Sequence, residues 1–222
     1  MGVKLKVGIF GGSFNPLHNG HLRAAEEVME ILDLDKVIFV PSSIHPVKND
    51  MNILDAKYRL KMLELATRDD VGFDVSDVEM KRPGPSYTID TLKHFANKYK
   101  NYKLFFILGT ENLARIDTWK DYKELFKFSN FAVVIRPGFN FSNIKDIIPG
   151  VLAKQFKLSE KTDNKTVYKH SSGNSLVFFK IKGIRISSTT LRKLVEKGKS
   201  IKYFVPDRVN KYILKNKLYL GE

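Results

Sequence analysis

The stretch GIFGGSFNPLHNGHL, residues 8–22, joins a short apolar run to an amphipathic one near the start of the chain. Gly11 and Gly12 follow the apolar run, and the pattern predicts a helix that begins near Gly20 or His21. Glycines permit a tight turn and a close approach of the backbone to a ligand, and a helix start presents unpaired amides to an anion. This joint therefore predicts a site for a polyphosphate.

Two imidazoles, His18 and His21, stand three positions apart at this joint. An imidazole there can donate a hydrogen bond to a phosphoryl oxygen, and a nearby phosphate favours its charged form. A single histidine beside a Gly-rich turn would more often be a cap or a solvated side chain, and the run matches neither GxGxxG nor GxxxxGK[ST]. Zinc binding by the two histidines is an alternative. However, no third ligand follows them at helical spacing, since Glu26 lies five residues past His21.

Outward from this stretch, short apolar runs alternate with amphipathic segments. The runs 7–10, 37–40, 104–108 and 131–135 are rich in Val, Ile and Phe, as in strands buried on both faces of a parallel sheet. Helical spacing of apolar residues occurs over 22–32, over 89–99 and after Asp55, which is expected to cap its helix. Strands that alternate with helices indicate βαβ units. We therefore predict an α/β fold with a doubly wound parallel sheet and ligands at the carboxyl ends of its strands.

The last third of the chain differs from the first two. Residues 140–183 are less regular, and the polar stretch SEKTDNKTVYKHSSGNS, residues 159–175, predicts a surface loop or hairpin. Beyond it we expect two helices, one capped by Ser187 or Ser188 and ended by Gly198, the other opened by Pro206. No repeat or linker divides the chain, so we predict one domain over 1–222, with a core at 1–183 and a small helical C-terminal segment at 184–222.

A second motif, ISSTTLR, occupies residues 186–192. The hydroxyls of Ser187, Ser188 and Thr189 precede a helix whose first turn carries Arg192, and such a helix start also suits phosphate. Alone it would be read as an N-cap followed by an exposed arginine. Its pairing with the histidine motif favours a second part of the same phosphate site.

Composition and charge bound the function. The chain has 38 Lys and Arg against 24 Asp and Glu, a formal charge of +14, which favours anionic partners without choosing among nucleotides, nucleic acids and membranes. Cysteine is absent, which excludes disulfides and thiolate metal sites. The apolar run of the first twelve residues is too short for a signal peptide or a membrane span, so we expect a cytoplasmic protein without a membrane partner.

The two motifs together resemble the HxGH nucleotidylyltransferase superfamily, and the residues between them resemble its bacterial nicotinate-nucleotide adenylyltransferase branch. The motifs that carry this resemblance follow one another in the family's order: SYTIDTL (86–92), LGTENL (108–113), DTW (117–119), VVIRPG (133–138) and VPDRVNKYILKNKLY (205–219). The resemblance covers nearly the whole chain and implies a Rossmann-like core.

The resemblance implies that the protein transfers AMP from ATP to nicotinate mononucleotide, with Mg²⁺, giving nicotinate adenine dinucleotide and pyrophosphate in NAD biosynthesis. It implies catalytic roles for His18, His21, Lys48 and Arg192 and no metal ligands in the protein. The implied ATP site adds Gly11, Gly12, Ser13, Phe14, Gly109, Ile186, Ser188 and Thr189. The implied nicotinate site comprises Ser86, Tyr87, Thr88, Trp119 and Arg136.

Two positions depart from the family pattern, and several alternatives stay open. Val47 stands where the family usually has His, and Glu111 where it usually has Asp. Within the same class, the acceptor could instead be nicotinamide mononucleotide or another small phosphate compound. From another class, a nucleic-acid-binding module would suit the positive charge, but the lysines are spread along the whole chain without a recognition motif, so we do not expect that partner. The oligomeric state stays open, a homo-oligomer included.

Overall fold

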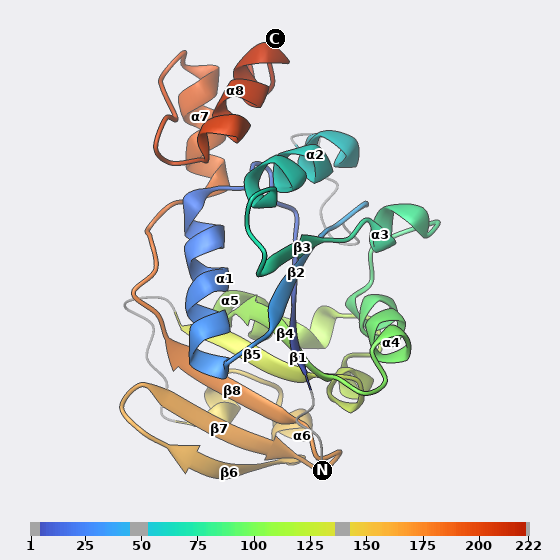
Figure 1. Ribbon diagram of the computed structural model, residues 1–222. Helices are drawn as coiled ribbons and strands as arrows, with labels where there is room; N and C mark the ends of the chain where they lie inside the picture. The colour runs from blue at the N-terminus through green and yellow to red at the C-terminus, as the bar shows by residue number, and fades with distance from the viewer. Residues whose placement is uncertain (1–4, 45–52, 136–142, 221–222) are drawn as a thin grey trace.

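The protein is built around one eight-stranded sheet (Figure 1). The structure, a computed structural model, describes residues 5–44, 53–135 and 143–220. The strands are β1 (Lys6–Gly12), β2 (Lys36–Pro41), β3 (Phe73–Val75), β4 (Lys103–Gly109), β5 (Asn130–Ile135), β6 (Phe156–Lys161), β7 (Lys165–His170) and β8 (Ser175–Lys180). Their order in the sheet is β3-β2-β1-β4-β5-β8-β7-β6. The strands from β3 to β8 in this order run parallel, and β7 and β6 continue the sheet antiparallel.

Helices cover both faces of the sheet, which confirms the predicted α/β, doubly wound fold (Figure 1). The α-helices are α1 (Asn19–Leu32), α2 (Ala56–Thr67), α3 (Val78–Lys81), α4 (Thr88–Lys98), α5 (Thr110–Leu113), α6 (Gly150–Ala153), α7 (Ser188–Glu196) and α8 (Asp207–Lys215). The 3-10 helices are η1 (Ile116–Thr118), η2 (Tyr122–Lys127) and η3 (Ile144–Asp146). Helix α1 begins at Asn19, one residue before the predicted start.

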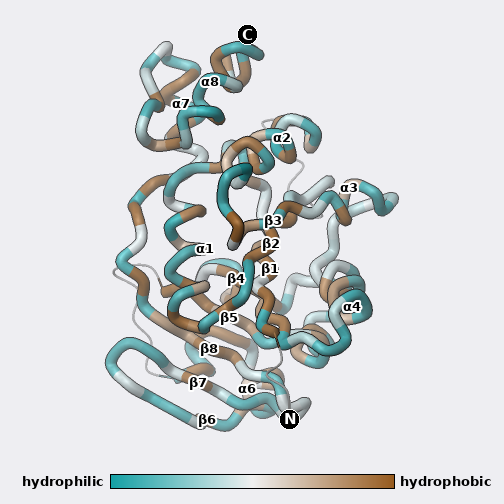
Figure 2. Tube along the Cα trace, viewed as in Figure 1, coloured by the Kyte–Doolittle hydropathy of each residue, from teal (hydrophilic) through white to brown (hydrophobic). Residues whose placement is uncertain are grey.

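The continuous apolar runs of the strands exist because both faces of the sheet are buried. In β4, Leu104, Phe106 and Leu108 join the core cluster under α4 and η2, whereas Phe105 and Ile107 join the one under α1 and α2. Successive side chains of a strand point to opposite faces, so a strand with a helix on each side needs apolar residues at every position. Figure 2 shows the hydrophobic residues concentrated along the central strands and the polar ones at the outer surface.

The region at 140–183 is more regular than predicted. A hairpin does form within the polar stretch, from β6 and β7. The expectation of an irregular segment is wrong for the residues after this hairpin, because Leu176 to Phe179 lie in β8, which pairs parallel to β5 and extends the central sheet. The short strand β3 was also not predicted.

The C-terminal segment packs against α2 rather than on the sheet. Leu191, Val195, Val209 and Ile213 of α7 and α8 form a separate apolar cluster with Met62 of α2. Figure 1 shows these two helices beyond the N-terminal end of α1, next to α2. The predicted cap of α7 is Ser187, whose hydroxyl accepts the amide of Thr190 at 3.1 Å.

The order of the strands locates a ligand site. The chain runs from β1 to β2 and β3 on one side of β1 and then crosses to β4 and β5 on the other side. The connections that follow β1 and β4 therefore leave the sheet in opposite directions, and the carboxyl ends of strands at such a switch point are where open α/β sheets bind ligands. Gly12 and Gly109 end these two strands.

Candidate active site

The turn after β1 is shaped by Phe14. This residue has a positive φ of 46°, and its ring is buried in edge contact with Phe39 at 5.7 Å between ring centroids. A Cβ at Gly12 would stand 3.1 Å from the Phe14 ring, so the backbone of the turn lies directly over this ring. Any contact of Phe14 with a nucleotide therefore involves its backbone.

The imidazoles of His18 and His21 lie stacked, with ring centroids 3.7 Å apart and an interplanar angle of 20°. His18 is the N-cap of α1, and the two side chains form a reciprocal capping box. The amide of His18 donates to Nδ1 of His21 at 3.3 Å. In the neutral ring of His21 the proton is then on Nε2, which makes Nε2 a hydrogen-bond donor for a ligand at the helix start.

The ISSTTLR motif docks on the loop that leads to these histidines. The hydroxyl of Ser188 donates to the carbonyl of Pro16 at 2.9 Å, and Nη1 of Arg192 donates to the carbonyl of Asn15 at 2.8 Å. The structure thereby brings the two motifs together, although the residues that form these two hydrogen bonds are 172 and 177 positions apart in the sequence. Thr189 is exposed at the start of the same helix. Ile186 packs against the C-terminal apolar cluster.

A buried carboxylate ties α1 to the segment that precedes the second motif. Glu27 accepts hydrogen bonds from Arg23 at 2.9 Å and from the amides of Lys182 and Gly183 at 2.7 and 3.0 Å. Burial alone would raise the pKa of Glu27, but these hydrogen bonds outweigh it and hold the pKa below its usual value. A Cβ at Gly20 would stand 3.0 Å from the carbonyl oxygen of Ile184, so this segment crosses directly over the histidine motif.

The residues implied for nicotinate binding lie around the start of α4. The hydroxyl of Ser86 is buried and accepts the amide of Ser43 at 2.8 Å, just past the end of β2. Tyr87 is the N-cap of α4, and Nζ of Lys120 lies 4.7 Å from the centre of its ring. Thr88 is the first residue of α4, and the amides of Thr88 and Ile89 precede the first hydrogen bonds of this helix, which Asp90 and Thr91 donate to the carbonyl of Tyr87.

Trp119 lies near the ends of the central strands. Its half-buried ring stands edge-on to Phe106 of β4, with centroids 6.2 Å apart. A Cβ at Gly11 would stand 3.3 Å from the Phe106 ring, so Phe106 contacts both the last part of β1 and Trp119. Oε2 of Glu111 would stand 2.8 Å from a Cβ at Gly109, so its carboxylate lies over the end of β4.

Two of the implied residues, Lys48 and Arg136, and the departure at Val47 lie outside the residues that the structure describes. Within the described ranges, no three His, Asp or Glu side chains are grouped so that they could hold a metal ion. No helix of the described part is long and apolar enough to cross a membrane.

Relatives of the chain are adenylyltransferases. The family model described as cytidylyltransferase-like matches residues 9–194. A probable nicotinate-nucleotide adenylyltransferase of Geobacter sp. strain M21 is 38% identical over 97% of this chain and 99% of its own length. The corresponding protein of Clostridium novyi strain NT is 39% identical over 96% of this chain and 98% of its own length. The chain belongs to the nicotinate-nucleotide adenylyltransferase family.

Solved structures show the same fold as this adenylyltransferase-family chain. The Plasmodium falciparum nicotinic acid mononucleotide adenylyltransferase complexed with NaAD superposes with a TM-score of 0.72 at 20% identity, over 97% of both chains. A putative nicotinate-nucleotide adenylyltransferase from Vibrio parahaemolyticus superposes with a TM-score of 0.64 at 18% identity, over 98% of this chain and 97% of that one.

Sequence reasoning missed several residues that build the site of this adenylyltransferase-family chain. Glu27, Arg59 and Asn15 have buried side chains whose hydrogen bonds hold loops of the site. Asn19 donates from its amide side chain to the carbonyl of Tyr203 at 2.7 Å. A charged residue on an amphipathic helix reads as solvated in sequence, and only burial distinguishes it. Of these residues, Asn19 could have been suspected from the sequence, because it lies inside the histidine motif.

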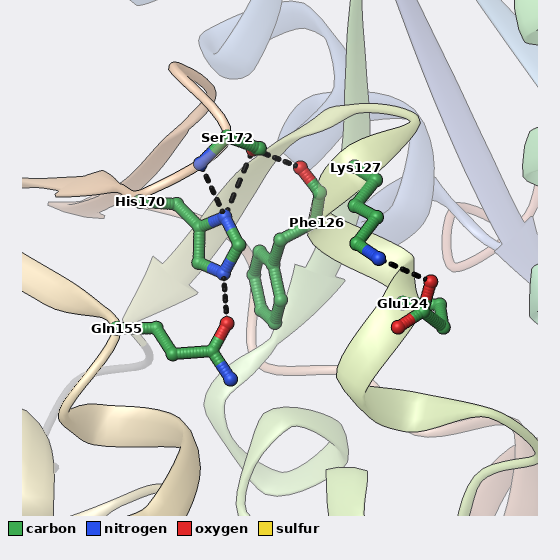
Figure 3. A network of polar contacts seen from close by, with 6 residues as sticks. All are labelled: Glu124, Phe126, Lys127, Gln155, His170 and Ser172. Atoms are coloured by element: carbon green, nitrogen blue, oxygen red, sulfur yellow. Dashed lines mark hydrogen bonds and ion pairs between the residues drawn. The ribbon is translucent and has the colours of Figure 1, made fainter.

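A further buried imidazole, His170, lies at the end of β7 and plays no part in this site (Figure 3). Its Nδ1 lies 2.8 Å from the hydroxyl of Ser172, and its Nε2 lies 2.9 Å from the side-chain oxygen of Gln155. Ser172 in turn donates to the carbonyl of Phe126 at 2.8 Å. Both ring nitrogens have protein partners, which is the arrangement of a structural histidine.

Proposed function

We propose that the protein transfers the AMP group of ATP to nicotinate mononucleotide and releases pyrophosphate. The observation that carries this proposal is the docking of Ser188 and Arg192 on the loop of Asn15 and Pro16, beside the stacked pair of histidines. This arrangement places a guanidinium, two imidazoles and two helix starts at the carboxyl ends of the strands, where a triphosphate can be bound along its length.

The proposed reaction needs no general base. A phosphate oxygen of nicotinate mononucleotide is already an anion at neutral pH, so it attacks the α-phosphorus directly and the bond to the leaving pyrophosphate breaks. Catalysis then consists of alignment and stabilisation of charge. The Nε2 proton of His21 and the guanidinium of Arg192 supply donors, and we propose Lys48 and His18 as further contributors. In this scheme, the triphosphate lies close to the backbone of Gly11, Gly12 and Ser13.

We infer that Mg²⁺ enters this site on the nucleotide. The described polar side chains near the turn after β1 are imidazole, hydroxyl, carboxamide and guanidinium groups, whereas Mg²⁺ is usually bound through one or two carboxylates, substrate phosphates and waters. The donor set therefore fits a metal that the triphosphate carries. When bound, the ion neutralises charge on the phosphates, and the residues of the chain orient the complex.

The start of α4 favours an acid over an amide as the acceptor's ring substituent. Nicotinate and nicotinamide have nearly the same size, so flat contacts with Tyr87 or Trp119 distinguish them poorly. The first amides of α4, near Thr88, offer only N–H donors, which suit a carboxylate. A carboxamide would turn its NH₂ group toward at least one of these donors and leave it unpaired.

The test is pyrophosphate release with nicotinate mononucleotide and nicotinamide mononucleotide side by side. We expect kcat/KM for the acid to be about 10²-fold higher, since an unpaired buried polar group costs about 1–3 kcal/mol and the carboxamide leaves at least one donor unpaired. Trp119→Ala is the matched control, because it should weaken both substrates and leave most of the ratio. Equal kcat/KM for acid and amide would contradict the proposed acceptor and favour the nicotinamide compound as a substrate.

A further inference from the structure

Arg59 of α2 is a fully buried cation whose hydrogen bonds all go to backbone carbonyls. Its side chain is 1% exposed, and no carboxylate of the described residues lies within ion-pair distance of it. Nε donates to Leu54 at 2.7 Å and Nη1 to Ser13 at 2.8 Å, while Nη2 donates to Ser42 at 2.6 Å and Ser43 at 3.2 Å. Arginine is rarely buried without a paired charge, so four carbonyls in its place are a specific arrangement.

The carbonyls that Arg59 binds belong to the two loops at the carboxyl ends of β1 and β2. Ser13 lies in the turn after β1, and Ser42 and Ser43 follow β2. In a trans peptide the N–H group points away from the carbonyl of the same plane, and the Ser13–Phe14 bond is trans. By turning the Ser13 carbonyl inward, Arg59 turns the amide of Phe14 away from itself.

The guanidinium of Arg59 is also connected to the start of α4, through the peptide between Ser42 and Ser43. The amide of Ser43, which follows the carbonyl of Ser42, donates to the hydroxyl of Ser86 at 2.8 Å. The amide of Ser86 donates to the carbonyl of Ile44 at 2.8 Å. Ser86 directly precedes Tyr87, the N-cap of α4, and the buried carboxylate of Glu79 accepts the hydroxyl of Thr91 in the first turn of this helix at 2.6 Å. The hydrogen bonds of Arg59 and Ser43 thus join the turn after β1 to Ser86, the residue before the N-cap of α4.

We propose that Arg59 is a positioning residue of the transferase, which sets the distance between the turn that holds the triphosphate and the helix start that holds the acceptor. This proposal rests on the proposed function. We place Arg59 outside direct contact with either substrate, since it is 1% exposed and four of its five N–H groups donate to backbone carbonyls. Its contribution is to the alignment of the acceptor phosphate with the α-phosphorus, and misplacement of reacting groups by about 1 Å can cost about 10²-fold in rate.

The test is the kinetics of Arg59→Lys, measured per folded molecule and well below its unfolding temperature. Lysine keeps the charge but lacks the planar fork that spans several carbonyls. We expect kcat to fall by about 10- to 100-fold while KM for ATP and for the acceptor changes by less than about threefold, the pattern of lost alignment rather than lost binding. In Arg59→Ala, millimolar guanidinium should restore part of kcat, and ammonium should not.

Two controls separate this role from simple stabilisation. Arg68→Lys makes the same exchange at an exposed position at the end of α2, and Leu63→Val removes a methylene from a buried position of α2. Both should keep the wild-type kcat, the second despite a lower unfolding temperature. The proposal is overturned if Arg59→Lys keeps kcat within about threefold of the wild type, or if it fails to fold at all.

The proposed function is judged separately, on the wild type. A wild-type protein that releases pyrophosphate only with nicotinamide mononucleotide would contradict the proposed acceptor. The Arg59 variants would then be measured with that compound, and the same expectations for kcat and KM would apply.

Discussion

His18 and His21 have a structural role at the start of α1 besides the catalytic role proposed for them. Their stacked rings cap α1, and the hydrogen bond from the His18 amide orients the ring of His21. Most N-caps are Ser, Thr, Asp or Asn, whose side-chain oxygens accept helix amides. In the proposed reaction, an imidazole at this position can cap the helix through one ring nitrogen and donate to the triphosphate through the other.

We expect His18→Ala and His21→Ala each to lower kcat for pyrophosphate release by about 10²-fold, the effect of losing one preorganised donor. Each change also removes half of the capping box and should cost about 1 kcal/mol in the free energy of unfolding. His94→Ala is the control, because His94 is exposed on α4 and should change neither quantity. Near wild-type turnover in both motif variants would contradict the proposed catalytic role of the two histidines.

At the scale of elements, the end of α7 depends on one glycine. Gly198 has a φ of 66°, and its amide donates to the carbonyl of Val195 while the next amide donates to Leu194. A side chain in this left-handed conformation costs about 1 kcal/mol. We expect Gly198→Ala to lower the free energy of unfolding by that amount in a denaturant titration.

The matched control is Gly150→Ala. Gly150 begins α6 without a positive φ, and a Cβ there would meet no atom within 4 Å. Alanine favours helix over glycine, so this variant should be neutral or slightly more stable. An equal loss at both positions would show that the conformation of Gly198 is not the cause.

At the end of β7, the buried His170 predicts a pH-dependent stability for the protein. Burial, followed by the charge of Lys127, lowers the pKa of His170 below its usual value of 6.5 (Figure 3). The unfolded chain then binds a proton more readily than the folded one, so stability is lost as the pH falls below 6.5. We expect the free energy of unfolding to fall less steeply between about pH 7 and pH 5 in His170→Gln than in the wild type. Identical slopes would place the titration elsewhere.

At the scale of the whole molecule, the C-terminal segment is tied to the core by specific polar contacts besides the apolar cluster with α2. The hydroxyl of Tyr219 donates to the side chain of Asn15 at 2.9 Å, the amide of Asn19 donates to Phe204 at 2.8 Å, and Arg208 pairs with Asp69 at 2.6 Å. We propose that the chain is a single domain in which these contacts couple the two parts.

We therefore expect one calorimetric transition, with the van't Hoff and calorimetric enthalpies of unfolding equal. Tyr219→Phe should lower the free energy of unfolding by about 1 kcal/mol through the lost hydrogen bond and keep the transition single. A separate early transition, in the wild type or in this variant, would show that the C-terminal segment unfolds on its own.

The sequence alone determined the local elements that have a strong apolar pattern or a capping residue of their own, but not β3 or β8. The apolar runs of β1, β2, β4 and β5, the stripe of α1, the Asp55 cap and the hydroxyls before α7 are all visible within a few residues. The joint of glycines and histidines at the first turn was equally readable, because each of its components acts on its immediate neighbours.

Only the tertiary structure decided which distant groups meet. The parallel pairing of β8 with β5 joins strands that are far apart in the chain, and no short stretch of either encodes it. The docking of Arg192 on Asn15 has the same character. Arg59 and Glu27 look like solvated charges on helices until burial and the carbonyls or amides around them are known. Local patterns specify elements, whereas the cost of burying a charge is determined by neighbours that only the complete fold supplies.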